Sequence, residues 1–186
     1  YQLSEINEKI RRDPAAFLAE CDAHYQERIH AAVDKILARM KESPIVLLSG
    51  PSGSGKTTTA MKVERELERR GVNAHTVSMD NYFKTLDRRT APRNAEGDID
   101  YESPRLLDMD LLDDTFTKLS HGEWVVVPKF EFARQMRNDS RGTPLKLGEN
   151  EIAIFEGIHA LNDDIAGRHP EATTLYISAR SNILEG

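Results

Sequence analysis

The sequence predicts an α/β fold with three layers, in which helices cover both faces of a mostly parallel sheet. Residues 45–48 and 152–155 are short, continuous apolar runs, which are typical of strands buried on both faces. A helical pattern follows the first run over residues 56–70, and Gly71 is placed to end that helix. Residues 74–78 indicate another strand, so strand, helix and strand form a βαβ unit within about 30 residues.

An N-terminal helical extension, residues 1–43, is expected to precede this core, residues 44–186. Asp13 and Pro14 form the pair of cap and first-turn proline that begins a helix. Apolar residues then recur at helical spacing and form one face. They are Ile29, Val33, Ile36, Leu37 and Met40. This face is explained either by packing on the core, which we favour, or by a contact with another domain or a second copy of the chain. A homo-oligomer therefore stays open.

The remaining segments continue the alternation of helices and strands. Residues 79–103 are polar and too long for a plain connector, which is typical of functional loops. Ser103 and Pro104 predict the start of another helix, and His121 and Gly122 predict its end. Short extended segments are expected at residues 125–127, 129–132, 143–147 and 174–178.

Composition and charge limit the classes of function. The chain has 25 Lys and Arg residues against 31 Asp and Glu residues, and its net charge of −6 argues against nucleic acid as a partner. No run approaches the roughly 20 apolar residues that a membrane-spanning helix needs. The one cysteine, Cys21, excludes a disulfide within the chain, so a reducing cytoplasm is the expected location.

The strongest chemical signal is a glycine-rich loop between the first strand and the helix after it. Its pattern of glycine, four residues and Gly-Lys-Thr occurs once, at residues 50–57. Glycines allow backbone angles that turn amide groups inward, and the helix adds its free amides and positive dipole end. This is a P-loop, in which Lys56 reaches the β- and γ-phosphates of a nucleotide and the Thr57 hydroxyl is placed to bind Mg²⁺. The residues expected to bind the nucleotide are Gly50, Pro51, Ser52, Gly53, Ser54, Gly55, Lys56, Thr57 and Thr58.

Two acids, Asp80 and Glu156, each follow a predicted strand. In open α/β sheets, ligands bind beyond the carboxyl ends of the strands. Phosphoryl transfer to a hydroxyl group needs one carboxylate that accepts the proton and another near the metal. The P-loop favours these roles over a turn cap for Asp80 and a surface position for Glu156. We therefore expect Asp80 to act as the base with Lys56 as the second catalytic residue, and Glu156 to join Thr57 at the metal.

Several segments together resemble a known family. They are residues 50–57, 78–83, 100–104 with 106–112, 128–132 and 155–158. Their order and spacing are similar to the uridine kinase and phosphoribulokinase family of P-loop kinases, and most of all to uridine kinase-like nucleoside kinases. The resemblance implies a P-loop NTPase core of the nucleoside and nucleotide kinase type. It also implies phosphorylation of a nucleoside 5′-hydroxyl with ATP or GTP as donor and Mg²⁺ as cofactor.

The resemblance further implies which residues bind the substrate. Positions that match the wall of the family's nucleoside pocket hold Phe83, Tyr101, Phe132 and Ile158. Glu102 stands where the family has an aspartate that holds the ribose hydroxyls, and Arg137 matches a family arginine. The family reads a pyrimidine with a tyrosine and a histidine, whereas this sequence has Phe130 and Gln135 at those positions. Phe130 can stack on a base, and Gln135 can pair with an amide edge.

We therefore expect an enzyme that phosphorylates a small molecule, a uridine- or cytidine-like nucleoside. Two alternatives stay open: a P-loop kinase of another alcohol, such as a sugar phosphate or a vitamin precursor, and a nucleotide-binding switch without efficient turnover. A sugar phosphate favours several basic residues opposite Asp80, whereas the aromatic positions favour a nucleoside. The family carries an arginine-rich lid beyond residue 178, and the core is expected to stop before this lid and the C-terminal elements, which favours the switch.

Overall fold

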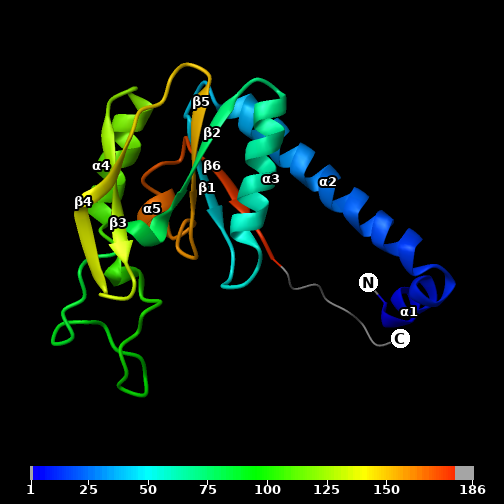
Figure 1. Ribbon diagram of the computed structural model, residues 1–186, viewed down its shortest axis with the longest axis horizontal. Helices are drawn as coiled ribbons and strands as arrows, with labels where there is room; N and C mark the ends of the chain where they lie inside the picture. Colours follow the sequence, from blue (N-terminus) through cyan, green and yellow to red (C-terminus); the bar gives the residue numbers. More distant parts are fainter. Residues whose placement is uncertain (1, 179–186) are drawn as a thin grey trace.

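The computed structural model describes residues 2–178, and within this range four parallel strands form a sheet in the order β2-β5-β1-β6. The strands are β1 (Ile45–Ser49), β2 (Asn73–Ser78), β5 (Glu151–Glu156) and β6 (Thr173–Tyr176). The helices are α1 (Leu3–Arg12), α2 (Pro14–Arg39), α3 (Lys56–Arg69), α4 (Met109–Ser120) and α5 (Asp163–Ala166). Helices α2 and α3 cover one face of the sheet, and α4 and α5 cover the other (Figure 1). This arrangement confirms the predicted α/β fold.

Strand β1 contributes side chains to the hydrophobic cores on both faces of the sheet. Ile45 and Leu47 belong to the hydrophobic core on the side of α4, whereas Val46 and Leu48 belong to the core on the side of α2 and α3. Each of the four side chains is at most 1% exposed. Consecutive side chains of a strand point to opposite faces, so a continuous apolar run fills two cores at once.

The predicted βαβ connection is present, but its two strands are not neighbours. Strand β5 lies between β1 and β2, with Glu156 opposite Leu48 on one side and opposite Ser78 on the other. This register aligns the carboxyl ends of three strands. The P-loop after β1, the residues after β2 and the end of β5 therefore share the edge of the sheet at which ligands bind.

Helix α2 is anchored in the core through its C-terminal half. It begins at Pro14, where the side chain of Asp13 accepts a hydrogen bond from the N–H of Ala16 at 3.0 Å. Its buried residues are Ile29, Val33 and Ile36. They pack against α3 and the sheet, while the other half of α2 projects from the core with α1 at its far end (Figure 1). The apolar face of α2 is therefore used for packing on the core.

The helix expected from Ser103 starts later than the sequence predicts. Pro104–Leu106 form a single 3-10 turn, η2, before the chain becomes extended at Leu107. Leu107 forms an isolated antiparallel β-bridge with Phe83, and Asp108 then caps α4 through its side chain. A tertiary contact with the segment after β2 thus overrides the local signal of serine followed by proline.

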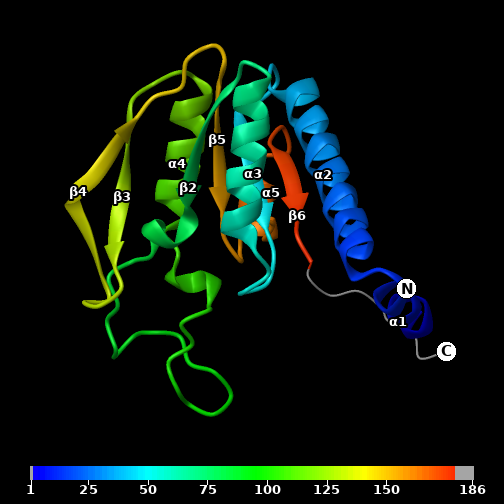
Figure 2. The same ribbon diagram turned by 45° about the vertical axis from the view of Figure 1, so that its right-hand side comes forward.

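The extended segments after α4 form one antiparallel hairpin rather than separate pieces. Its strands are β3 (Val125–Glu131) and β4 (Met136–Leu145), and the hairpin stands beside α4 (Figure 2). Strand β3 continues through Pro128, where the register shifts between Val127 and Lys129. Proline has no N–H to donate, so it is tolerated within a strand at such an irregularity.

The long polar segment between β2 and α4 begins with a 3-10 helix, η1 (Met79–Tyr82), and then projects from the end of the molecule at which the parallel strands end (Figure 2). Its outer part is held by hydrogen bonds of its own. The N–H of Asn94 donates to the carbonyl oxygen of Asp98 at 2.9 Å, and the N–H of Asp100 donates to that of Pro92 at 2.9 Å. The segment is therefore a folded loop beside the ligand-binding edge.

Among residues 2–178, none of the helices combines the length and the apolar character needed to cross a membrane. Residues 179–186, where the core is expected to stop before the lid, lie outside the described part of the chain.

Candidate active site

The P-loop connects β1 to α3. Gly53 and Gly55 have φ angles of 71° and 87°, in the left-handed region that favours glycine. Gly50 lies at the base of the loop against Ile177, whose N–H donates to the carbonyl oxygen of Ser49 at 2.8 Å. The end of β6 therefore supports the start of the loop, and the two later glycines give the loop its turn.

Helix α3 directs free amide groups towards this loop. Its first hydrogen bond runs from the N–H of Thr59 to the carbonyl oxygen of Gly55, at 2.9 Å. The N–H groups of Lys56, Thr57 and Thr58 thus have no partner within the helix. Together with the positive end of the helix dipole, they form a site for an anion such as a phosphate.

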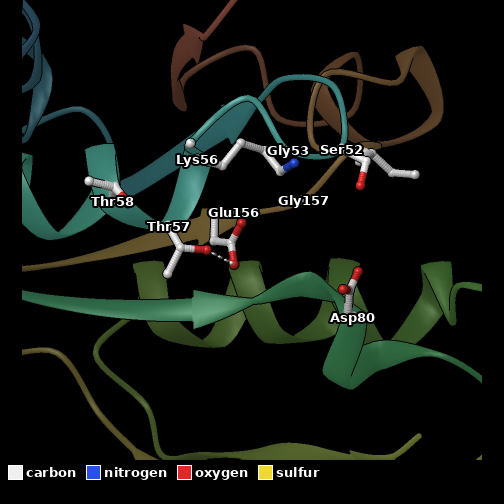
Figure 3. Close-up of a pocket in the computed structure, with 10 residues that line it drawn as sticks. Ser52, Gly53, Lys56, Thr57, Thr58, Asp80, Glu156 and Gly157 are labelled. Carbon is white, nitrogen blue, oxygen red and sulfur yellow. Dashed lines mark hydrogen bonds between the residues drawn. The ribbon is translucent and has the colours of Figure 1, made fainter. Parts of the chain in front are cut away.

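A cavity of about 390 Å³ opens at this helix end (Figure 3). Its lining residues are Ser52, Gly53, Gly55, Lys56, Thr57, Thr58, Asp80, Glu156, Gly157 and Ile158. The structure therefore brings both predicted acids to the predicted cradle. Three residues expected to bind the nucleotide do not line the cavity: Gly50 packs against Ile177, Pro51 accepts a hydrogen bond from Lys56 Nζ at 3.0 Å, and Ser54 lines a neighbouring cavity.

The two acids are partly withdrawn from water. Burial raises the pKa of Asp80, and the electrostatic interactions with Lys56 and His159 oppose this rise. Burial also raises the pKa of Glu156, and the negative charge of Asp80 adds to the rise, while Lys56 and a hydrogen bond from Thr57 oppose it. Additional positive charge in the cavity would therefore stabilise the ionised form of each carboxylate.

The side-chain oxygens of Thr57 and Glu156 lie next to each other in the cavity, and both are suitable ligands for a divalent cation. The Oγ1 of Thr57 donates a hydrogen bond to the Oε1 of Glu156 at 3.4 Å (Figure 3). Mg²⁺ prefers oxygen ligands and is usually bound by one or two protein side chains together with phosphate oxygens. The donor set and the raised pKa of Glu156 both fit such an ion.

Gly157 fixes the approach of η1 to β5. A Cβ at Gly157 would lie 2.9 Å from the Cβ of Met79, a distance that real side chains do not adopt. Met79 is buried and directly precedes Asp80 in the chain. Gly157 thus sets the position from which Asp80 enters the cavity. The sequence alone assigned it no role, although a glycine directly after a strand-end acid is a signal for close backbone approach.

A second cavity, of about 220 Å³, collects most of the predicted substrate residues. Its lining residues are Phe83, Lys84, Leu86, Tyr101, Leu106, Phe130, Phe132 and Gln135. The ring of Phe130 meets the rings of Phe83 and Phe132 edge to face, at centroid distances of 5.6 Å and 5.1 Å. Asn81, to which the sequence alone assigned no role, connects this aromatic wall to the first cavity. It directly follows Asp80 in the chain, and its side-chain oxygen accepts a hydrogen bond from the N–H of Phe130 at 3.3 Å.

Two predicted substrate residues lie near the two cavities but not in the second one. Ile158 lines the first cavity, beside the acids. Glu102 is exposed, and its backbone oxygen lies 2.6 Å from the Nε2 of His159. This contact connects the loop after η1 to the residues that follow β5.

Arg137 is held by carboxylates of the protein itself. Its guanidinium lies 2.7 Å from the Oδ2 of Asp108 and 2.9 Å from the Oδ1 of Asp139. Because Asp108 caps α4, Arg137 joins the hairpin to the start of that helix. The structure therefore gives Arg137 a packing role and does not place it in either cavity.

A P-loop on a parallel sheet, with carboxylates at the ends of two further strands, defines a P-loop protein of the kinase-like class. Residues 45–182 match the phosphoribulokinase / uridine kinase family. The chain belongs to this family, which confirms the resemblance inferred from its motifs.

Curated relatives are uridine kinases. The uridine kinase of Schizosaccharomyces pombe is 34% identical over 117 residues, which cover 63% of this chain and 25% of the relative. The uridine kinase of Staphylococcus aureus strain JH9 is 31% identical over 126 residues, which cover 68% of this chain and 58% of the relative. The aligned part of the chain thus spans a quarter of the first relative and less than two thirds of the second.

Solved structures show the same fold. A structure described as a possible uridine kinase from Bacillus stearothermophilus has a TM-score of 0.65 at 20% identity, covering 84% of this chain and 83% of that one. The D-glycerate 3-kinase of Cryptococcus neoformans has a TM-score of 0.56 at 19% identity, covering 74% of this chain and 53% of that one. At these identities the likeness establishes the fold alone.

Proposed function

We propose that the protein transfers the γ-phosphoryl group of ATP or GTP to a hydroxyl group of a small molecule, and that the acceptor is the 5′-hydroxyl of a uridine- or cytidine-like nucleoside. The observation that carries this proposal is the meeting of Asp80, Lys56 and the P-loop in one cavity (Figure 3). Phosphoryl transfer requires a cradle for the phosphates, positive charge at the transferring group and a carboxylate for the hydroxyl proton. The cavity contains each of these parts.

The donor nucleotide is held by the amide groups at the start of α3 and by Lys56. Thr57 and Glu156 would hold Mg²⁺, which when bound supplies positive charge against the charge of the phosphates. The hydroxyl–carboxylate pair and the raised pKa of Glu156 support this assignment. Lys56 Nζ stays close to the loop through its hydrogen bond to the Pro51 oxygen at 3.0 Å. Bound phosphate oxygens are stronger acceptors and would replace this bond.

Asp80 accepts the proton of the attacking hydroxyl group. Burial raises its pKa, which makes the carboxylate a better base at neutral pH than an ordinary surface acid. The nearby charge of Lys56 favours the ionised form of Asp80, so the carboxylate is available to take up a proton. Its position directly after Met79 is fixed by the contact with Gly157.

The aromatic cavity supports a nucleoside as the acceptor. Flat rings such as those of Phe130, Phe132 and Tyr101 suit the face of a base, and Gln135 can pair with its amide edge. A sugar phosphate needs several cations, whereas Lys84 is the cationic residue among those that line this cavity. We assign the ribose hydroxyls to Glu102, which directly follows Tyr101 in the chain.

The test is a nucleotide consumption assay on the full chain. ATP and GTP are supplied with Mg²⁺ and with uridine, cytidine, a purine nucleoside, a sugar phosphate or no acceptor, and the phosphorylated product is identified. The proposal predicts phosphorylation of a pyrimidine nucleoside. If only the sugar phosphate is phosphorylated, the acceptor belongs to another class of alcohol and is not a nucleoside. Nucleotide binding without any transfer would indicate a switch.

A further inference from the structure

A cavity beside the P-loop takes no part in the phosphoryl transfer proposed for this protein. It has a volume of about 420 Å³, within the usual range for a small-molecule site. Its lining shares Gly55 and Thr58 with the phosphate cavity and includes neither Asp80 nor Glu156. Figure 3 shows Thr58 and Asp80 at opposite ends of the labelled residues. The cavity therefore adjoins the cradle at the end remote from the proposed base.

Three parts of the chain line this cavity: α2, the start of α3 with the P-loop, and the end of β6. Helix α2 supplies Tyr25, Arg28, Ile29 and Ala32. The end of β6 and the residues after it supply Leu175, Tyr176, Ile177 and Ser178. Helix α2 precedes residue 45, at which the match to the family begins. One wall of the cavity is thus built by the N-terminal extension of this chain.

The wall that α2 presents is held in place by α3. The hydroxyl group of Tyr25 shares a hydrogen bond with the Oγ1 of Thr59 at 2.7 Å. The Nζ of Lys62 lies 4.1 Å from the centroid of the Tyr25 ring, within the range of a cation–π contact. Ile29 is 3% exposed and anchors the next turn of α2 in the core. These contacts link α2 to the helix whose N-terminus forms the phosphate cradle.

The cavity offers the groups that a nucleobase needs. Apolar side chains of Ile29, Ala32, Leu175 and Ile177 suit the faces of a flat ring. Arg28 lines the cavity and is exposed, and within residues 2–178 its guanidinium has no ion pair or side-chain hydrogen bond. A guanidinium can stack on a base or donate hydrogen bonds to its edge.

We propose that α2 is part of the donor site: through Arg28 and Ala32 it forms the outer wall of the cavity that receives the nucleoside end of the phosphate donor. The inference rests on the proposed function, because it takes a polyphosphate in the cradle as its starting point. The γ-phosphate lies at the end near Asp80 and Lys56, so the rest of the donor leaves past Gly55 and Thr58 into the cavity. The N-terminal extension is then part of the donor site.

The test compares two ligands that share the phosphates and differ in the nucleoside. Binding of ATP and of inorganic tripolyphosphate, each with Mg²⁺, is measured by calorimetry on the full chain. Ala32→Phe fills the cavity and is expected to weaken ATP binding about tenfold while tripolyphosphate binding changes by less than about twofold. The control Ala31→Phe makes the same change at the exposed preceding position of α2, outside the cavity, and should alter neither.

A second variant, Arg28→Glu, tests the same wall if Ala32→Phe does not fold. Arg28→Glu alters an exposed side chain, so the fold tolerates it, and it reverses the charge at the cavity wall. It is expected to weaken ATP binding more than tripolyphosphate binding. Equal weakening of both ligands, or no change for either variant, would overturn the role of α2 and leave the cradle intact. Failure of the unaltered protein to bind either ligand would instead refute the proposed function.

Discussion

Met79 lies so close to Gly157 that the glycine has room for a hydrogen atom only, since a Cβ there would be 2.9 Å from the Cβ of the methionine. The glycine follows Glu156 in the chain, and the methionine precedes Asp80. One contact between two neighbouring strand ends therefore sets the spacing of the two acids on which the proposed chemistry depends.

The substitution Gly157→Ala is expected to displace η1 and with it Asp80. An added methyl group in a packed region destabilises a protein by about 1–3 kcal/mol, and a small misplacement of a catalytic group can lower kcat by about a hundredfold. Chemical denaturation and steady-state kinetics measure the two effects. At the control position Gly148, a Cβ would meet its nearest neighbour, Glu151 Oε2, at 3.6 Å, so Gly148→Ala should change neither quantity. Full activity of Gly157→Ala would show that the contact does not position the base.

Replacement of Asp80 by asparagine is expected to stabilise the protein at neutral pH in the absence of ligands. Burial raises the pKa of Asp80 in the folded state above its ordinary value of 3.8. A carboxyl group with a raised pKa stabilises the fold when protonated, and this contribution is lost as the pH rises through the raised pKa. Asparagine is neutral throughout. It also removes the negative charge that contributes to the raised pKa of Glu156.

The pH dependence of thermal unfolding checks this prediction. The Tm of Asp80→Asn should exceed that of the unaltered protein at about pH 7, and the difference should shrink as the pH falls towards and below the ordinary carboxyl pKa. A lower Tm for the variant at neutral pH would mean that the carboxylate is stabilised by its surroundings.

The variant Phe132→Ala is expected to raise the KM for the nucleoside about tenfold, since stacking of a base on an aromatic ring contributes about 1–3 kcal/mol. The KM for ATP should stay the same, because Phe132 lines the second cavity and not the phosphate cradle. Phe132 is 61% exposed, so the stability of the fold should change little. Trp124→Ala is the matched control: it removes an aromatic ring that is 67% exposed and lies outside both cavities. Equal effects of the two variants would argue against a base-binding wall.

Substitutions at Arg137 and Asp108 are expected to have non-additive effects on the free energy of unfolding. Their side chains are 24% and 23% exposed, and the pair joins β4 to the start of α4. We expect Arg137→Met to lower the free energy of unfolding by about 1–2 kcal/mol, as for other hydrogen bonds between charged groups. Asp108→Asn should have a similar effect, and the double variant should be less destabilised than the sum. A rise in nucleoside KM with unchanged stability would instead place the Arg137 guanidinium on the substrate.

The features that the sequence predicted correctly are those that local chemistry determines. The P-loop follows from three glycines at fixed spacing before a lysine, and β1 and β5 follow from runs that are apolar at every position. The acids could be located because Glu156 ends the apolar strand β5 and Asp80 follows β2, a strand that the sequence also predicts. These signals are complete within a few residues, so tertiary contacts do not alter them.

The features that the sequence did not predict depend on contacts between distant segments. The place of β5 between β1 and β2 is a property of the sheet, and no local pattern encodes it. The bridge from Phe83 to Leu107 delays α4. The predicted segments on either side of Pro128 belong to one strand, β3, because both pair with β4. The wall that α2 provides beside the P-loop likewise depends on the bond between Tyr25 and Thr59.

The role of Asp80 as the base is tested most directly by single-turnover transfer from Mg²⁺-ATP to the accepted nucleoside, with excess protein. Asp80→Asn is expected to lower the transfer rate by about 10²–10⁴-fold, as for loss of a general base, and to retain the binding of ATP. Asp110→Asn, which makes the same change at an exposed acid on α4, should transfer at the normal rate. Transfer by Asp80→Asn at the rate of the unaltered protein would contradict the assignment of the base.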